Sequence, residues 1–185
     1  VDSLCPVWGK LYRRSLIQKS GARFVDLAEI GSYEDGFFNL EVFGKADRVV
    51  YLAAYLYHYR RDGSSSVTSG YNPRLYDQWQ TLYDRMEAII RSNQLGSEYE
   101  AALNNRIALG ILGLGLNITV STQSMGKKMK DIRRIIRQER YRKAYKNLPL
   151  NYFPIHWKLF YGCARHGFAF GVYVLLTVIQ RIISR

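Results

Sequence analysis

Two adjacent carboxylates, Glu34 and Asp35, stand at the start of a predicted helix, within the stretch GSYEDGFFNLEVF. An acid in a first turn interacts favourably with the helix dipole, and Asp35 lies three residues after Ser32, which together resemble a capping box. Capping needs only one acid, however. A second carboxylate that points into a cleft can accept a proton from a hydroxyl nucleophile. The pair therefore has a structural and a catalytic interpretation.

Hydrophobic spacing predicts that helices form most of the chain around this pair. A left-handed Gly21 is expected to end the first helix. Glycines at 110, 113 and 115 indicate close packing or a kink in the fourth. The helices are expected over residues 10–20, 34–45, 72–93, 98–120 and 126–147, followed by an apolar segment at 166–185.

The stretch RVVYLAAYLYHYRR, residues 48–61, interrupts the helical pattern. It is rich in Val and Tyr and has a period of two, which predicts one long or two short strands. The composition of residues 62–70, DGSSSVTSG, predicts a loop.

Charge divides the chain into a neutral body and a basic tail. Lys and Arg balance Asp and Glu up to residue 126, so residues 127–185 carry the whole net charge of +12. Such tails bind phosphate groups, in nucleic acid or in anionic lipid. The uncharged run 166–180 is shorter than the ~20 residues that span a bilayer. Because this run lies beside a basic helix, the tail is expected to be a membrane-interface segment. The alternatives are plain helical packing and nucleic-acid binding, and the sequence contains no nucleic-acid-binding motif.

The two cysteines, Cys5 and Cys163, lie far apart and match no metal-site spacing. They are consistent with reduced thiols in a cytoplasmic protein. The chain opens on VDSLCPVWGKLY without a starting Met or a signal peptide, and we expect a fragment of a longer protein.

Residues 4–70 resemble the second half of the catalytic domain of bacterial family 2 glycosyltransferases. The resemblance rests on the ordered segments WGKLYRRSLI, YEDGFFNLEVF, VVYLAAYLYHYRR and SSSVT. It implies an α+β, mostly α chain: a remnant of a GT-A (Rossmann-like) domain with a short β element, followed by a helical C-terminal extension. It also implies synthesis of exopolysaccharide, capsule or lipopolysaccharide.

The resemblance assigns Asp35 as the general base of an inverting transfer and Glu34 as its orienting neighbour. It also places Trp8 and Lys10 beside the acceptor, where an indole can stack on a sugar face. The alternative for Trp8 is an ordinary core position.

In related enzymes the loop after the Tyr-rich strand approaches the donor diphosphate or the acceptor. Arg forks and Ser hydroxyls suit phosphate oxygens. The resemblance therefore adds substrate-binding candidates, with a structural role as the alternative for the histidine: His58, Arg60, Arg61, Ser64 and Ser65.

Displacement at an anomeric carbon also needs positive charge on the leaving nucleoside diphosphate. The family supplies it with a divalent metal, Mn²⁺ or Mg²⁺, on an Asp-x-Asp motif. No such motif occurs in this sequence, so we expect the metal ligands mostly outside this chain and no activity from the chain alone.

The sequence thus predicts a catalytic part at 1–70, a helical extension at 71–126 and a basic, apolar tail at 127–185. The expected function is transfer of a sugar from a nucleotide-sugar donor to a saccharide or lipid-linked acceptor, without nucleic acid as a partner. The expected location is the cytoplasmic side of a bacterial plasma membrane, bound to its anionic surface. The alternative is a non-catalytic helical module that docks on membranes or proteins.

Overall fold

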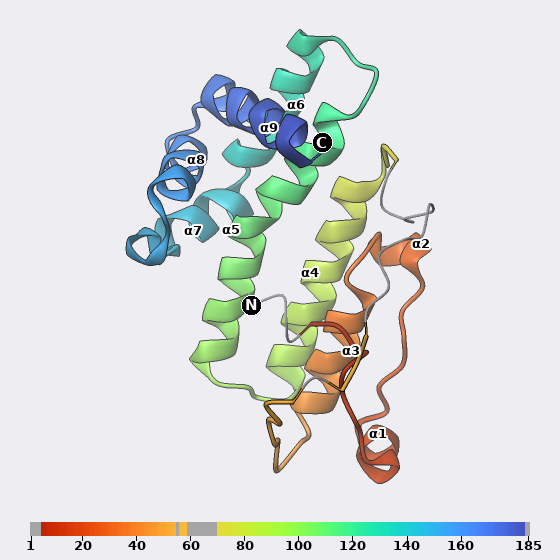
Figure 1. The fold of residues 1–185 in the computed structure, drawn as a ribbon. Coiled ribbons are helices and arrows are strands. Elements are labelled where there is room, and N and C mark those ends of the chain that lie inside the picture. Colours follow the sequence, from red (N-terminus) through yellow and green to blue (C-terminus); the bar gives the residue numbers. More distant parts are fainter. Residues whose placement is uncertain (1–4, 55, 59–69, 184–185) are drawn as a thin grey trace. The chain divides into compact units, whose positions relative to one another are not determined.

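The computed structural model describes residues 5–54, 56–58 and 70–183, and these residues form helices and no β-strand (Figure 1). The chain divides into two compact units. Unit 1 comprises Val1–Ser69 and Arg74–Gly96, and unit 2 comprises Gly70–Pro73 and Ser97–Arg185. The units differ from the segments expected from the sequence, because the helix after residue 74 groups with the first part of the chain and the next helix groups with the basic tail.

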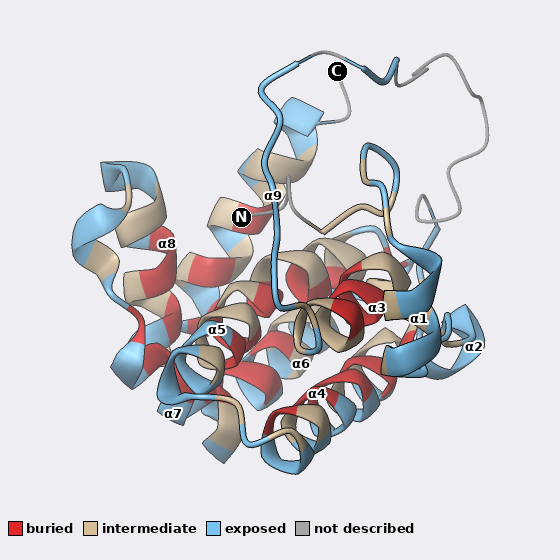
Figure 2. Cartoon of the chain, turned by 90° about the horizontal axis from the view of Figure 1, so that it is seen from below, coloured by how far each residue is buried: buried red, intermediate tan, exposed pale blue. Residues whose placement is uncertain are grey.

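Unit 1 is built around a ten-residue helix and the longer helix that follows it. Phe37, Phe38 and Val42 are buried on α3, and Trp79 and Leu82 are buried on α4. The buried residues of α4 form one band along the helix, with exposed residues on its other side (Figure 2). The helices of this unit are α1 (Arg14–Ser20), α2 (Leu27–Ile30), α3 (Glu34–Phe43) and α4 (Leu75–Ser92). Gly21 ends α1 in the left-handed region at φ 68°, as predicted.

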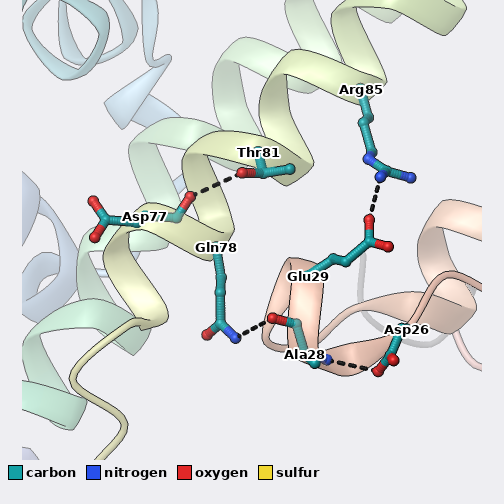
Figure 3. Close-up of polar contacts among 7 residues, drawn as sticks. All are labelled: Asp26, Ala28, Glu29, Asp77, Gln78, Thr81 and Arg85. Atoms are coloured by element: carbon teal, nitrogen blue, oxygen red, sulfur yellow. Dashed lines mark hydrogen bonds and ion pairs between the residues drawn. The ribbon is translucent and has the colours of Figure 1, made fainter.

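Polar contacts from α4 fix the short helix α2 (Figure 3), and a further contact fixes the turn that precedes α3. The Gln78 side chain donates to the Ala28 carbonyl at 3.0 Å. The Trp79 indole donates to the Ser32 hydroxyl at 3.0 Å. Gly31 has a φ of +74°, and a Cβ there would lie 2.7 Å from the Gln78 amide oxygen. Glycine at this position therefore allows α2 to approach α4.

Unit 2 packs its helices around the central helix α5, which contacts α6, α7 and α9. Apolar residues at helical spacing form the buried side of α5: Leu103, Ile107, Ile111, Leu114 and Ile118. The elements are α5 (Ser97–Thr119), α6 (Met125–Arg137), α7 (Glu139–Asn147), the 3-10 helix η2 (Leu150–Tyr152), α8 (Ile155–Arg165) and α9 (Ala169–Ile183).

The single helix predicted over 126–147 is instead two helices. Gln138 has an extended backbone, with φ −63° and ψ 146°, which ends α6 and precedes α7. Each helix buries its own apolar set, including Ile132 and Ile136 on α6 and Tyr141 and Tyr145 on α7. Because of this break, each of the two short helices orients its own apolar face toward the core. Hydrophobic spacing read over one continuous helix does not predict such a break.

No strand forms in the described part of 48–61, namely 48–54 and 56–58, where the sequence predicts strands. The apolar residues Val49, Val50 and Leu52 are exposed there. A strand is stable only when its backbone groups pair with a neighbouring strand, and the described residues offer none. The assignment of residues 1–70 to a GT-A remnant stays a prediction.

One described helix, α5, is long and apolar enough to cross a membrane by length and composition. This is weak evidence for a span, because the central helix of a helical core meets the same criteria. The contacts of α5 with α6, α7 and α9 fit that second description.

The structure confirms close packing at Gly115 of α5. A Cβ at this position would lie 2.4 Å from a terminal carbon of Leu176 on α9, and Leu176 is fully buried. We expect Gly115→Ala to destabilise unit 2 by about 1–3 kcal/mol, because overpacking outweighs the gain in helix propensity of ~1 kcal/mol. Thermal or denaturant unfolding of the purified protein measures this.

Gly162 of α8 is the matched control, because a Cβ there meets nothing within 4 Å. Gly162→Ala should therefore raise stability by up to about 1 kcal/mol through propensity alone. If Gly115→Ala also stabilises the protein, α5 and α9 do not pack as closely as described.

Candidate functional site

One face of α3 holds the N-terminal loop (residues 5–12) through two polar side chains. The Asp35 Oδ2 atom accepts a hydrogen bond from the Val7 backbone amide at 3.0 Å. The Asn39 amide donates to the Cys5 carbonyl at 2.6 Å, and its Oδ1 accepts from the Tyr12 hydroxyl at 2.6 Å. Because Asp35 and Asn39 are four residues apart, they lie on the same helix face.

The predicted capping box is wrong. The residue before α3 is Tyr33, in the left-handed conformation at φ 76°, and no side chain caps the helix. The Ser32 hydroxyl instead accepts from the Trp79 indole. Asp35 is thus a tertiary anchor for the N-terminal loop, 28 residues away in sequence, and it also benefits from its place in the first turn.

Gly36 makes room for the Tyr33 ring over the first turn of α3. A Cβ at position 36 would lie 2.4 Å from a carbon of that ring. The Tyr33 hydroxyl lies 2.8 Å from the Cys5 sulfur, and both Cys5 and Cys163 are free thiols. Sequence reasoning missed this role of Gly36, although a glycine in the first turn of a helix was the available signal.

Trp8 and Lys10 lie in the same loop as the amide that Asp35 binds. Trp8 is 44% exposed, so the alternative of a core position is wrong. Its indole stacks on Tyr57, with ring centroids 5.0 Å apart. The Lys10 ammonium donates to the Pro6 carbonyl.

Glu34 precedes Asp35 in the first turn and is half-buried. No hydrogen bond or ion pair joins its side chain to another residue in the described part of the chain. His58 follows Tyr57, the partner of Trp8. The structure therefore gathers Asp35, Glu34, Trp8 and Lys10 at the start of α3, with His58 next in sequence to the ring that covers the indole.

The other predicted substrate-binding residues are Arg60, Arg61, Ser64 and Ser65, and they lie outside the described residues. Their contact with a donor diphosphate or an acceptor stays a prediction.

The negative charge of Asp35 acts on a neighbouring phenol. Burial raises the pKa of Tyr12, and the charge of Asp35 raises it further, against a smaller opposing effect of the Asn39 hydrogen bond. Tyr12 therefore keeps its proton near neutral pH and remains the donor to Asn39.

A separate open groove of about 440 Å³ lies on another side of α3, between α2, α3 and α4. Phe37 and Glu41 line it, and Arg85 lines it from α4. Position 37 is turned by about 200° from position 35 on a helix, so Asp35 does not line this groove. Burial raises the pKa of Glu41, partly offset by a hydrogen bond from the Arg23 backbone and by the charge of Arg85.

No group of three or more His, Cys, Asp or Glu side chains that could hold a metal ion occurs among the described residues. The described residues therefore do not fit a metal centre of their own.

The chain is similar to three bacterial proteins that are named glycosyltransferases. The chain is 34% identical to EpsH of Bacillus subtilis (strain 168) over 102 residues, which is 55% of this chain and 29% of EpsH. It is 31% identical to EpsJ of the same organism over 157 residues, covering 84% of this chain and 44% of EpsJ. It is 31% identical to GlyA of Streptococcus pneumoniae serotype 4 over 161 residues, covering 81% of this chain and 21% of GlyA. No protein-family model and no solved structure matches the chain.

All three relatives carry the word glycosyltransferase in their names, and EpsJ is named as uncharacterized. These similarities support a glycosyltransferase family for the chain. The chain spans between a fifth and just under half of the length of these relatives.

The raised pKa of Glu41 predicts a pH-dependent cost to stability. A carboxyl whose pKa is higher in the folded state binds its proton more tightly there, so stability falls as the pH rises through and above its ordinary value of 4.5. Gln cannot lose a proton. We therefore expect Glu41→Gln to raise the melting temperature relative to the unsubstituted protein at about pH 7, and to raise it less at about pH 4.

Thermal melts of both proteins at the two pH values test this. A stabilisation by Glu41→Gln that is equal at both pH values, or larger at the lower one, would contradict a pKa raised by burial.

Proposed function

We propose that this chain supplies the acceptor side of a nucleotide-sugar glycosyltransferase, with Asp35 as the general base of an inverting transfer. The observation that carries the proposal is the half-buried Asp35 carboxylate, held by the Val7 amide beside the exposed indole of Trp8. The glycosyltransferase names of the relatives support the reaction class.

The geometry suits a base. The Val7 amide fixes Oδ2 and with it the orientation of the carboxylate. The Oδ1 atom has no hydrogen-bond partner among the described residues, and an ionised carboxylate keeps lone pairs for a hydroxyl proton. In the proposed step the acceptor oxygen bonds to the anomeric carbon, the bond from that carbon to the nucleoside diphosphate breaks, and the acceptor proton passes to Asp35.

The neighbours of Asp35 suit the binding of an acceptor. Trp8 presents a large aromatic surface on which a sugar ring can lie, and its stack on Tyr57 limits the motion of the indole. Glu34 lies next to the base and can accept hydrogen bonds from other sugar hydroxyls. Arg60 and Arg61, with the serines at 64 and 65, are the proposed contacts to phosphate.

The proposal extends to the rest of the protein. The donor is a nucleotide-sugar, and a divalent metal, Mn²⁺ or Mg²⁺, would neutralise the leaving diphosphate through ligands outside this chain. The acceptor is a saccharide or a lipid-linked saccharide in cell-surface polysaccharide synthesis. The reaction takes place at the cytoplasmic face of a bacterial plasma membrane, with the basic tail at the anionic surface.

The substitution Asp35→Asn in the full-length protein distinguishes the proposed role of Asp35 as a base from its structural role as an anchor of the N-terminal loop. Asn keeps an oxygen that can accept from the Val7 amide, but it cannot take a proton. We expect transfer to fall by about 10²–10⁴ while the melting temperature stays near that of the unsubstituted protein. Nucleoside diphosphate release from a panel of UDP- and GDP-sugars, with a membrane-derived acceptor fraction, measures the first, and calorimetry measures the second.

Asp77→Asn is the matched control. Asp77 is an exposed acid in the first turn of α4. Replacing it with Asn is the same chemical change at a position that does not hold the N-terminal loop. Full activity is expected of this variant. Near-normal turnover by Asp35→Asn would leave Asp35 as a structural anchor and favour a non-catalytic docking module.

A further inference from the structure

Helix α9 is apolar on both of its sides. Ala169, Val172 and Leu176 are buried, where α9 packs on α5, α6 and α8. The opposite side presents Phe170, Val174, Val178 and Ile182, four residues apart from one another, so they form a row along the helix. We call this row, together with the neighbouring Phe168, the α9 stripe; its members are between 41% and 69% exposed.

A row of this kind needs a partner. A surface helix normally places polar and charged residues opposite its buried face, and contiguous exposed apolar patches mark sites of interaction. The one charged residue on the exposed side within the described part of α9 is Arg181. The Phe168 and Phe170 rings lie 6.2 Å apart, so the α8–α9 turn extends the apolar surface beyond the helix itself.

The part of the chain that contains the α9 stripe carries only basic charged residues. Residues 140–185 contain no Asp or Glu, and eight of them are Lys or Arg. Arg181 stands at one end of the stripe. At the other end, Arg165 precedes the α8–α9 turn, and the Arg137 side chain approaches Gly167 of that turn. All three arginines are exposed.

We infer that α9 lies flat in the interface of an anionic lipid bilayer, with the α9 stripe among the acyl chains and these arginines at the phosphate headgroups. A helix of 15 residues is about 22 Å long, which is too short to span the ~30 Å hydrocarbon core. Apolar burial on one side with basic residues at the rim is the arrangement of interfacial helices.

This inference rests on the membrane location within the proposed function, and it does not depend on the chemistry of Asp35. An anionic bilayer suits the surface better than a protein partner does, because arginines flank the stripe at both ends and residues 140–185 contain no acid. A second copy of this chain would bring like charges together at the same edges.

Co-sedimentation of the full-length protein with vesicles tests the inference. We expect binding to vesicles of equal parts phosphatidylcholine and phosphatidylglycerol, weakened by added salt but not abolished, because burial of the stripe does not depend on screening. Vesicles of phosphatidylcholine alone should bind at least about tenfold more weakly at low salt.

The triple variant Phe170→Gln, Val174→Gln, Val178→Gln should lose at least about tenfold in affinity at high salt. These side chains are exposed, so the fold should survive, as circular dichroism and melting would show. The matched control replaces three exposed apolar residues of unit 1, Leu11, Val49 and Val50, with Gln and should bind like the unsubstituted protein.

A second pair of substitutions tests the charges without touching the stripe. Arg137→Gln with Arg181→Gln should flatten the salt dependence while leaving high-salt binding in place. Equal loss of binding in the triple variant and its control would overturn the inference. So would absence of binding to anionic vesicles, or a dimer in sedimentation that the triple variant abolishes.

Transferase activity in detergent, measured on the same preparations, separates the two proposals. Normal turnover without vesicle binding would overturn the α9 assignment alone. Vesicle binding that depends on the stripe would support the α9 assignment. If the Asp35→Asn variant of the same protein remains active, the proposed role of Asp35 as the base is wrong while the α9 assignment stands.

Discussion

The buried amide of Asn39 is the constraint on which the candidate site depends. Only 3% of this residue is exposed, and its amide binds the Cys5 carbonyl and the Tyr12 hydroxyl at once. Leaving such a buried group unpaired costs about 1–3 kcal/mol, so the N-terminal loop cannot leave α3 without a penalty. One helical turn earlier, Asp35 holds the Val7 amide of the same loop. The position of Trp8, the next residue, is therefore coupled to the proposed base.

The observed anchoring role of Asp35 is compatible with its proposed role as a base, because the two roles use different oxygens. The Val7 backbone amide orients the carboxylate through Oδ2. A base that is already oriented accelerates the reaction more than a mobile one, because its positioning is achieved before the reaction. Gly36 contributes by letting the Tyr33 ring cross the first turn toward Cys5. In unit 2, the absence of a side chain at Gly115 similarly allows α9 to approach α5, which leaves the α9 stripe on the other side of that helix exposed.

Local signals predicted much of the helical architecture, and long-range contacts explain what they missed. The buried stripe of α5 and the left-handed Gly21 follow from spacing and from the conformational freedom of glycine. The Asn39 contact with Cys5 joins residues 34 apart in sequence, and no periodicity in the sequence encodes it. The sequence pattern predicts Ser32 as a helix cap, but in the structure its hydroxyl accepts a hydrogen bond from the Trp79 indole. The Tyr-rich segment after residue 48 has a strand-like pattern, but a strand also requires a partner, which the pattern cannot supply.

A structure of the full-length protein with an acceptor saccharide bound tests the central claim most directly. The account predicts that the reacting hydroxyl lies about 2.6–3.2 Å from a carboxylate oxygen of Asp35, with the Trp8 ring against the sugar and the Val7 amide still on the other oxygen. An acceptor seated in the groove beside Glu41, or a hydroxyl held by Glu34 while Asp35 contacts only the N-terminal loop, would contradict it.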